Sequence, residues 1–193
     1  MLSEIKDLRN SKISQVVSSK LKEFETNNQW FSELCFCILT ANSKAQTAIN
    51  IQNEIGETGF ISLSQEKLVE IIKKNKHRFH NNKAKYIVEA RKYYNIKGIL
   101  NNLNEFEARE FLVENIKGIG YKESSHFLRN VGYKHLAILD RHILSLMKEE
   151  KPLNRKNYLD IEKKFNQIAK KLDMNSAELD LYMWYLKTGK ILK

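Results

Sequence analysis

The sequence has 193 residues, 42% of them hydrophobic, which is enough for one domain with a core or for two small halves that share a cleft. Its 33 Lys and Arg residues against 23 Asp and Glu residues give a formal net charge of +10. That excess favours a polyanionic partner, nucleic acid before an anionic membrane surface, although a lysine-rich proteome would produce a similar surface. No run of about 18 apolar residues marks a transmembrane helix, and residues 1–14 lack the apolar core of a signal peptide. We therefore expect a cytoplasmic protein with no membrane partner.

Apolar residues recur at helical spacing along almost the whole chain, and no two-residue alternation continues beyond a few positions. Residues 30–41, WFSELCFCILTA, are almost wholly apolar and predict a helix that is buried on nearly every side. The pattern predicts an all-α protein of about nine or ten helices, with breaks at residues 56–64, 96–103 and 149–155. The apolar positions that define the other helices are Ile13, Val16, Val17, Leu21 and Phe24; Leu68, Ile71 and Ile72; Tyr86, Ile87 and Ala90; Phe106, Phe111 and Leu112; Tyr158, Ile161, Phe165, Ile168 and Leu172; and Leu179, Tyr182, Met183 and Leu186.

The chain has two cysteines, Cys35 and Cys37, both in the apolar segment. Two positions apart in a helix they point to different faces, and no second cysteine pair completes a zinc site. We predict two buried free thiols. His77 and His80 are three residues apart but have no further ligands nearby in the sequence, which argues against a metal site.

Two glycines, Gly118 and Gly120, flank Ile119 in the stretch ENIKGIGYKESSHFL, residues 114–128. Glycine allows a positive φ and leaves the backbone bare, so the N–H groups of the turn and of the following helix can form an anion site. We expect Ile119 to point into the core and Gly132 to end the second helix. The pattern is that of a helix–hairpin–helix element, which binds the DNA backbone without reading the base sequence. An ordinary corner between two helices would also fit these glycines.

Lys122 follows the turn, and Asp140 lies in the segment HLAILDRHIL further along the chain. Taken singly, Lys122 fits a solvated lysine and Asp140 fits a helix N-cap. Taken together, a GIGxK hairpin followed by an apolar run, Asp140 and His142 resembles the helix–hairpin–helix DNA glycosylase superfamily. The resemblance implies an all-α fold of two helical lobes with the active site in the cleft between them. It also implies that Lys122 is the nucleophile, Asp140 its partner, and His142 a contact to a DNA phosphate alongside Gly118 and Gly120.

The chemistry of base excision explains these residue types. Breaking the N-glycosidic bond at C1′ places positive charge on the sugar, which a nearby carboxylate stabilises. An amine can form a Schiff base at C1′, and the imine permits β-elimination of the 3′ phosphate. A free lysine amine has a pKa of about 10.4, so it must lose a proton before it attacks.

Three further blocks narrow the resemblance within the superfamily. ELCFCILTAN (33–42), NKAKYIVEAR (82–91) and YLKTGKILK (185–193) are similar to those of the compact archaeal-type 8-oxoguanine DNA glycosylase/AP lyase. No cysteine follows Cys37, which excludes the four-cysteine iron–sulfur cluster of endonuclease III, and the chain leaves no room for the β domain of the eukaryotic enzyme. The resemblance implies one glycosylase domain over residues 1–193, with a hairpin element at about 107–132. It also implies no cofactor, damaged double-stranded DNA as the partner, and action as a monomer.

The resemblance also assigns roles outside the hairpin. Asn42 matches the polar residue that fills the gap left by a flipped base, although it would also fit a helix cap. Trp184 and the terminal carboxylate of Lys193 are implied in recognising the base, although core packing and a frayed end are the respective alternatives. A monovalent cation is implied at three hairpin carbonyls, those of Glu114, Ile116 and Ile119.

Two other functions remain open from the sequence. One is a related bifunctional glycosylase for another lesion, such as an oxidised pyrimidine. The other is a non-catalytic helix–hairpin–helix module that binds DNA, but such a module has no use for both Lys122 and Asp140.

Overall fold

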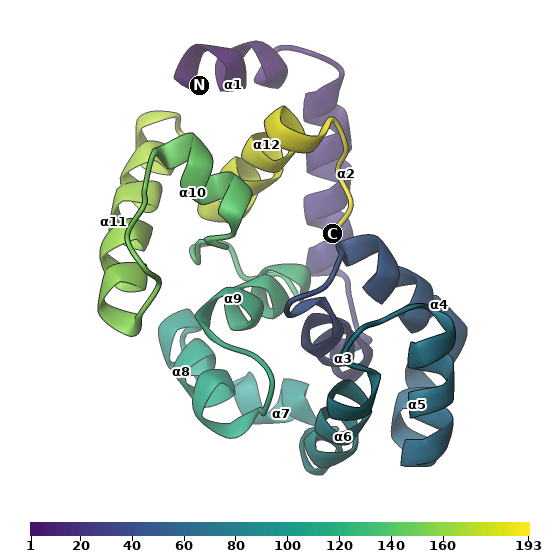
Figure 1. Cartoon of the computed structure of the whole chain (residues 1–193). Coiled ribbons are helices and arrows are strands. Elements are labelled where there is room, and N and C mark those ends of the chain that lie inside the picture. The colour runs from purple at the N-terminus through teal and green to yellow at the C-terminus, as the bar shows by residue number, and fades with distance from the viewer. The chain divides into compact units, whose positions relative to one another are not determined.

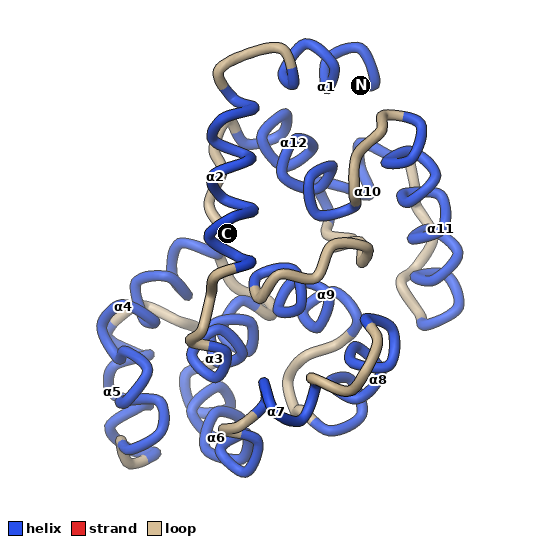
Figure 2. The backbone as a smooth tube through the Cα atoms, turned by 180° about the vertical axis from the view of Figure 1, so that it is seen from behind, coloured by secondary structure: helices blue, strands red, loops and turns tan.

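The computed structural model describes residues 1–193 and contains twelve α-helices, one short 3₁₀ helix and no strand (Figures 1 and 2). The prediction of an all-α fold is confirmed, but the predicted number of helices was too low. The difference arises from short elements that lack a long apolar period, such as α1 and α7. The helices are α1 (Leu2–Arg9), α2 (Ile13–Glu25), α3 (Trp30–Thr40), α4 (Ala45–Ser62), α5 (Gln65–Lys74), α6 (His80–Ala90), η1 (Arg91–Tyr93), α7 (Ile96–Leu100), α8 (Glu105–Asn115), α9 (Tyr121–Asn130), α10 (Arg141–Met147), α11 (Arg155–Lys171) and α12 (Ser176–Thr188).

The chain divides into two compact units. The terminal unit comprises Met1–Asn27 and Leu128–Lys193, and the central unit comprises Asn28–Phe127. The boundary therefore falls within α9.

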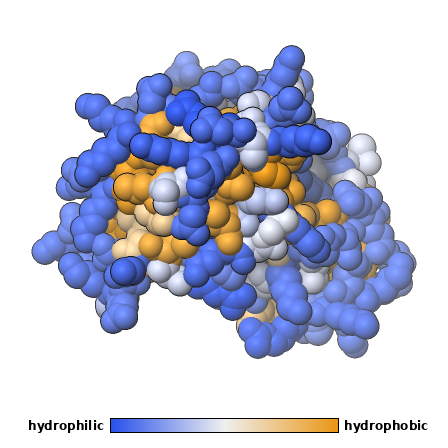
Figure 3. Space-filling view, turned by 90° about the horizontal axis from the view of Figure 1, so that it is seen from above, coloured by the Kyte–Doolittle hydropathy of each residue, from blue (hydrophilic) through white to orange (hydrophobic).

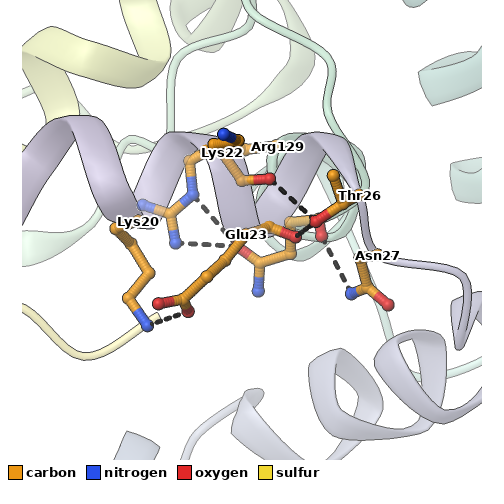
Figure 4. Close-up of polar contacts among 7 residues, drawn as sticks. Lys20, Lys22, Glu23, Thr26, Asn27 and Arg129 are labelled. Carbon is orange, nitrogen blue, oxygen red and sulfur yellow. Dashed lines mark hydrogen bonds and ion pairs between the residues drawn. The ribbon is translucent and has the colours of Figure 1, made fainter.

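The terminal unit contains a buried ion pair between Arg129 and Asp180. The same guanidinium lies over the ring of Phe24 at 4.9 Å and donates to the side chain of Asn130 at 2.8 and 3.0 Å. Asn27 in turn donates to the carbonyl of Asn130 at 3.0 Å, close to the end of α2 (Figure 4). Burial raises the pKa of Asp180 to about 6 while Arg129 acts in the opposite direction, so the pair is ionised at neutral pH. These contacts fix the end of α9 to α2 and α12.

The central unit is built around α3, in which every residue is buried. Helices α4, α6 and α7 pack against it, as an element that is apolar on all sides requires. Cys35 and Cys37 are buried free thiols, as predicted, and burial raises the pKa of Cys35.

Two of the predicted breaks are only partly right. Residues 56–62 continue α4, which is kinked at Gly56, where φ is +67°. Residues 96–100 form α7, because the side chain of Asn95 caps its first turn at the N–H of Gly98. The third break is confirmed, since no helix covers residues 149–154.

Hydrophilic side chains cover much of the face seen in Figure 3, and apolar groups show between them. Val16 and Phe106, which the helical period placed among the apolar stripes, are about half exposed. The helical period identifies which apolar residues share one face of a helix, but the neighbouring helices bury only part of that face. No helix combines the length and apolar character needed to cross a membrane.

Candidate active site

The hairpin between α8 and α9 needs a glycine at its first turn position. Gly118 has a φ of +88°, and a Cβ atom there would lie 2.4 Å from Cδ2 of Tyr86 on α6. Glycine is therefore required both by the backbone and by the approach of α6. Gly120 has open space by comparison, and its carbonyl accepts the N–H of Ser124 at 2.9 Å to begin α9. Ile119 is buried, as predicted, and anchors the turn in the central unit.

Lys122 stands in the first turn of α9 and is neither buried nor fully solvated. Its side chain is 34% exposed, and its Nζ lies 2.9 Å from Oε1 of Glu123. The other oxygen of Glu123, Oε2, accepts the backbone N–H of Gly120 at 3.2 Å. The ammonium therefore has a defined counter-ion, and its side chain is less exposed than a fully solvated lysine would be.

A second lysine near this cluster was missed by the sequence analysis. Lys83 on α6 is only 5% exposed, and no ion pair or hydrogen bond engages its ammonium group. Burial lowers the pKa of Lys83 to about 8, Glu123 raises it and Lys122 lowers it further. Its burial could have been predicted from helical spacing, because Lys83 lies on the same face of α6 as Ile87 and Ala90, which are buried.

Asp140 is the N-cap of α10, as the helix N-cap alternative for this residue predicts. Its Oδ1 atom accepts the backbone N–H groups of His142 and Ile143, both at 2.8 Å. The capping role fixes the carboxylate with two hydrogen bonds to one oxygen and leaves Oδ2 available for other chemistry. A structural and a catalytic role are therefore compatible at this residue.

His142 and Trp184 lie together in the terminal unit. Their ring centroids are 5.1 Å apart with an interplanar angle of 89°. The indole N–H of Trp184 is buried and has no hydrogen-bond partner, which is costly for a polar group. Trp184 and Lys193 are each partly exposed, so Trp184 is not fully enclosed in the core.

Asn42 has a left-handed backbone with φ of +60° directly after α3, and its side chain is exposed. Asn42 directly follows Ala41, the C-cap residue of α3, so its left-handed backbone fits the helix-cap alternative at a C-terminus, while the N-cap of α4 is Lys44.

Groups of three or more His, Cys, Asp or Glu side chains that could hold a metal ion do not occur. His77 instead donates from Nε2 to the carbonyl of Leu39 at 2.9 Å, because its Nδ1 accepts the N–H of Phe79. Burial lowers the pKa of His77. The carbonyls of Glu114, Ile116 and Ile119 accept no backbone hydrogen bond outside a helix.

These features define a class of protein. An all-α chain with a glycine hairpin, a lysine in the first turn that follows, and an aspartate at the start of a short helix fits the class of helix–hairpin–helix DNA glycosylases. The class is defined by the arrangement, since each of these features alone has an ordinary structural explanation.

The comparisons with known proteins agree with this class. Residues 14–174 match the family described as 8-oxoguanine DNA glycosylase. A relative from Methanocaldococcus jannaschii, called 8-oxoguanine DNA glycosylase/AP lyase, is 50% identical over 206 residues, which cover 100% of this chain and 99% of the relative. A solved structure of the enzyme from that organism, in complex with a 15mer DNA containing 8-oxoguanine, has a TM-score of 0.95 at 49% identity and covers 100% and 99% of the two chains. The enzyme of Thermotoga maritima has a TM-score of 0.92 at 40% identity, with coverage of 100% and 98%.

The chain therefore belongs to the 8-oxoguanine DNA glycosylase family. The predicted family, the helix–hairpin–helix fold and the enzyme class of glycosylase with AP lyase activity are confirmed. The roles of the individual site residues stay predictions.

Proposed function

We propose that the chain removes 8-oxoguanine from double-stranded DNA with Lys122 as the nucleophile and then nicks the abasic site. The observation that carries the proposal is the position of Lys122 in the first turn of α9, directly after the glycine turn. The chain shares 49% identity with an enzyme whose structure contains 8-oxoguanine DNA.

The reaction begins when the amine of Lys122 attacks C1′ of the flipped nucleotide. The new C–N bond forms as the N-glycosidic bond breaks, and the base departs with the electron pair of that bond and takes up a proton, while the attached nitrogen of Lys122 loses one. Asp140 stabilises the positive charge that develops on the sugar, with Oδ2 as the available oxygen. Ring opening gives the Schiff base. Loss of a C2′ proton then breaks the bond from C3′ to the 3′ phosphate.

Other residues hold the DNA in this proposal. The N–H groups of the turn at Gly118 and Gly120 bind a backbone phosphate, and His142 binds another. Trp184 and the carboxylate of Lys193 contact the damaged base, and Asn42 fills the gap that it leaves. A monovalent cation bound by the carbonyls of Glu114, Ile116 and Ile119 would add positive charge beside the phosphate.

The two units act together as one glycosylase domain over residues 1–193, with the hairpin element at about 107–132. The enzyme works as a monomer in the cytoplasm and without a membrane partner. The proposed chemistry uses only a lysine, a carboxylate and the DNA itself, so it needs neither an iron–sulfur cluster nor another cofactor.

A borohydride experiment tests the proposal. Three duplexes carrying 8-oxoguanine, thymine glycol or an abasic site are incubated with the protein and borohydride. We expect a covalent adduct on 8-oxoguanine DNA that is lost in Lys122→Gln and kept in Lys117→Gln, a neighbouring exposed lysine that pairs with Glu89 at 3.1 Å. A preference for thymine glycol would favour the oxidised-pyrimidine alternative. Absence of any adduct would favour the non-catalytic module and refute the enzyme.

A further inference from the structure

Glu123 links two groups of the hairpin that have proposed roles. Its Oε1 atom lies 2.9 Å from Nζ of Lys122, and its Oε2 atom accepts the N–H of Gly120 at 3.2 Å. The side chain of Glu123 is only 13% exposed, so both contacts are largely shielded from water. One carboxylate thus engages both the proposed nucleophile and a backbone donor proposed to hold a DNA phosphate.

These contacts are incompatible with the proposed complex. A phosphate at the N–H of Gly120 competes with Oε2 of Glu123 for the same hydrogen, and the two anions repel each other at that distance. The ammonium group of Lys122 has no lone pair, so it has to give up a proton to solvent before its nitrogen can attack C1′, and its side chain has to part from the carboxylate of Glu123 to reach C1′. Displacement of Glu123 by the phosphate frees the N–H of Gly120 and the side chain of Lys122 together, and Lys122 then loses its proton to solvent.

The surroundings within the central unit make such a displacement feasible. Charged or titratable groups on the elements around this cluster include Lys83 on α6, His77 in the loop before α6, and Glu110 and Arg109 on α8, where the Arg109 guanidinium lies 5.2 Å from the ring centroid of Tyr121. Glu110 is engaged by a tyrosine hydroxyl at 2.7 and 2.8 Å, and His77 is bonded to backbone. Lys83 has no partner of its own, so a Glu123 carboxylate that leaves Lys122 still has a positive charge nearby.

We propose that Glu123 is a positioning residue that holds Lys122 in the DNA-free protein and releases it when a DNA phosphate takes the N–H of Gly120. The inference rests on the roles proposed above for Lys122 and Gly120. It adds that binding of the DNA backbone is coupled to activation of the nucleophile.

The test compares Glu123→Gln with Glu70→Gln. Glutamine at position 123 can still accept the N–H of Gly120, so the start of α9 is retained. Glu70 lies on α5 and pairs with Lys67 at 2.8 Å in an exposed position, so its substitution removes the same charge and a similar ion pair away from the hairpin.

Binding is measured on a duplex with a tetrahydrofuran abasic analogue, which cannot form a Schiff base. We expect Glu123→Gln to bind this duplex about 3- to 10-fold more tightly than the wild type, because the competing anion is gone. The rate of borohydride trapping on 8-oxoguanine DNA is then measured from pH 5 to 9. Its acidic limb should move to lower pH in Glu123→Gln and to higher pH in Lys83→Met, which removes a positive charge. Glu70→Gln should match the wild type in both experiments.

Unchanged affinity together with an unchanged pH profile in Glu123→Gln would overturn the proposal. Loss of trapping with normal binding would also overturn it, because Glu123 would then be needed for the chemistry itself. A failure of the nucleophile assignment is recognised separately. If Lys122 is not the nucleophile, the covalent adduct will survive in Lys122→Gln. The affinity measurement on the tetrahydrofuran duplex needs no nucleophile, so it tests the role of Glu123 independently.

Discussion

Replacing Lys83 by methionine should stabilise the protein at neutral pH. Burial lowers the pKa of Lys83 from 10.5 to about 8, and this ammonium has no partner. Holding it charged at pH 7 costs about 3 kcal/mol. Methionine keeps most of the apolar stem and its packing while removing the charge. We therefore expect Lys83→Met to raise the free energy of unfolding at pH 7 by about 2–3 kcal/mol.

The pH dependence of this gain has a defined sign. Between pH 8 and 10.5 the unfolded chain binds more protons at Lys83 than the folded chain does, so the stability of the wild type rises with pH across that window. Below pH 8 both states carry the proton and the full penalty is present. The advantage of Lys83→Met should therefore be largest at pH 7 and should disappear as the pH approaches 10.5.

Urea unfolding at several pH values measures this difference. Lys85→Met is the matched control, because Lys85 is on the same helix but exposed, with its only carboxylate partner, Glu89, 4.0 Å away. That variant should stay within about 0.5 kcal/mol of the wild type. A Lys83→Met variant that is destabilised at pH 7, or whose effect is the same at pH 7 and 10, would refute the reasoning.

Two further predictions concern the active site and the hairpin. Asp140→Asn and Asp140→Ala should both slow base excision strongly in single-turnover assays while DNA binding persists. Only the alanine variant should lose stability, by about 1 kcal/mol, because asparagine still caps α10; equal stability of the two would contradict the capping role. Gly118→Ala should destabilise the protein by about 1–3 kcal/mol in thermal unfolding, since its Cβ would meet Tyr86 at 2.4 Å on a backbone with φ of +88°. Gly120→Ala is the control, since its Cβ would approach no atom closer than 3.8 Å, and a similar loss in both variants would refute this account.

The helical fold was predictable because its signal is local. Apolar residues at helical spacing identify α2, α11 and α12, and the all-apolar composition of α3 correctly predicts complete burial. Short elements were less predictable, since α7 spans five residues and depends on a cap from Asn95 rather than on a period. The kink in α4 at Gly56 was read as a break because glycine signals a change of direction without giving its size.

The sequence by itself determined the all-α class and the glycine hairpin, and the presence of both Lys122 and Asp140 at their spacing along the chain led to the family. These features depend on residue type and spacing along the chain, which the sequence states directly. Only the tertiary structure decided that Glu123 holds Lys122, that Tyr86 excludes a side chain at position 118, and that Lys83 is a buried charge without a partner. Desolvation and hydrogen bonding depend on which groups meet in space, and the sequence does not distinguish a lysine with a buried amine from one whose amine is in water.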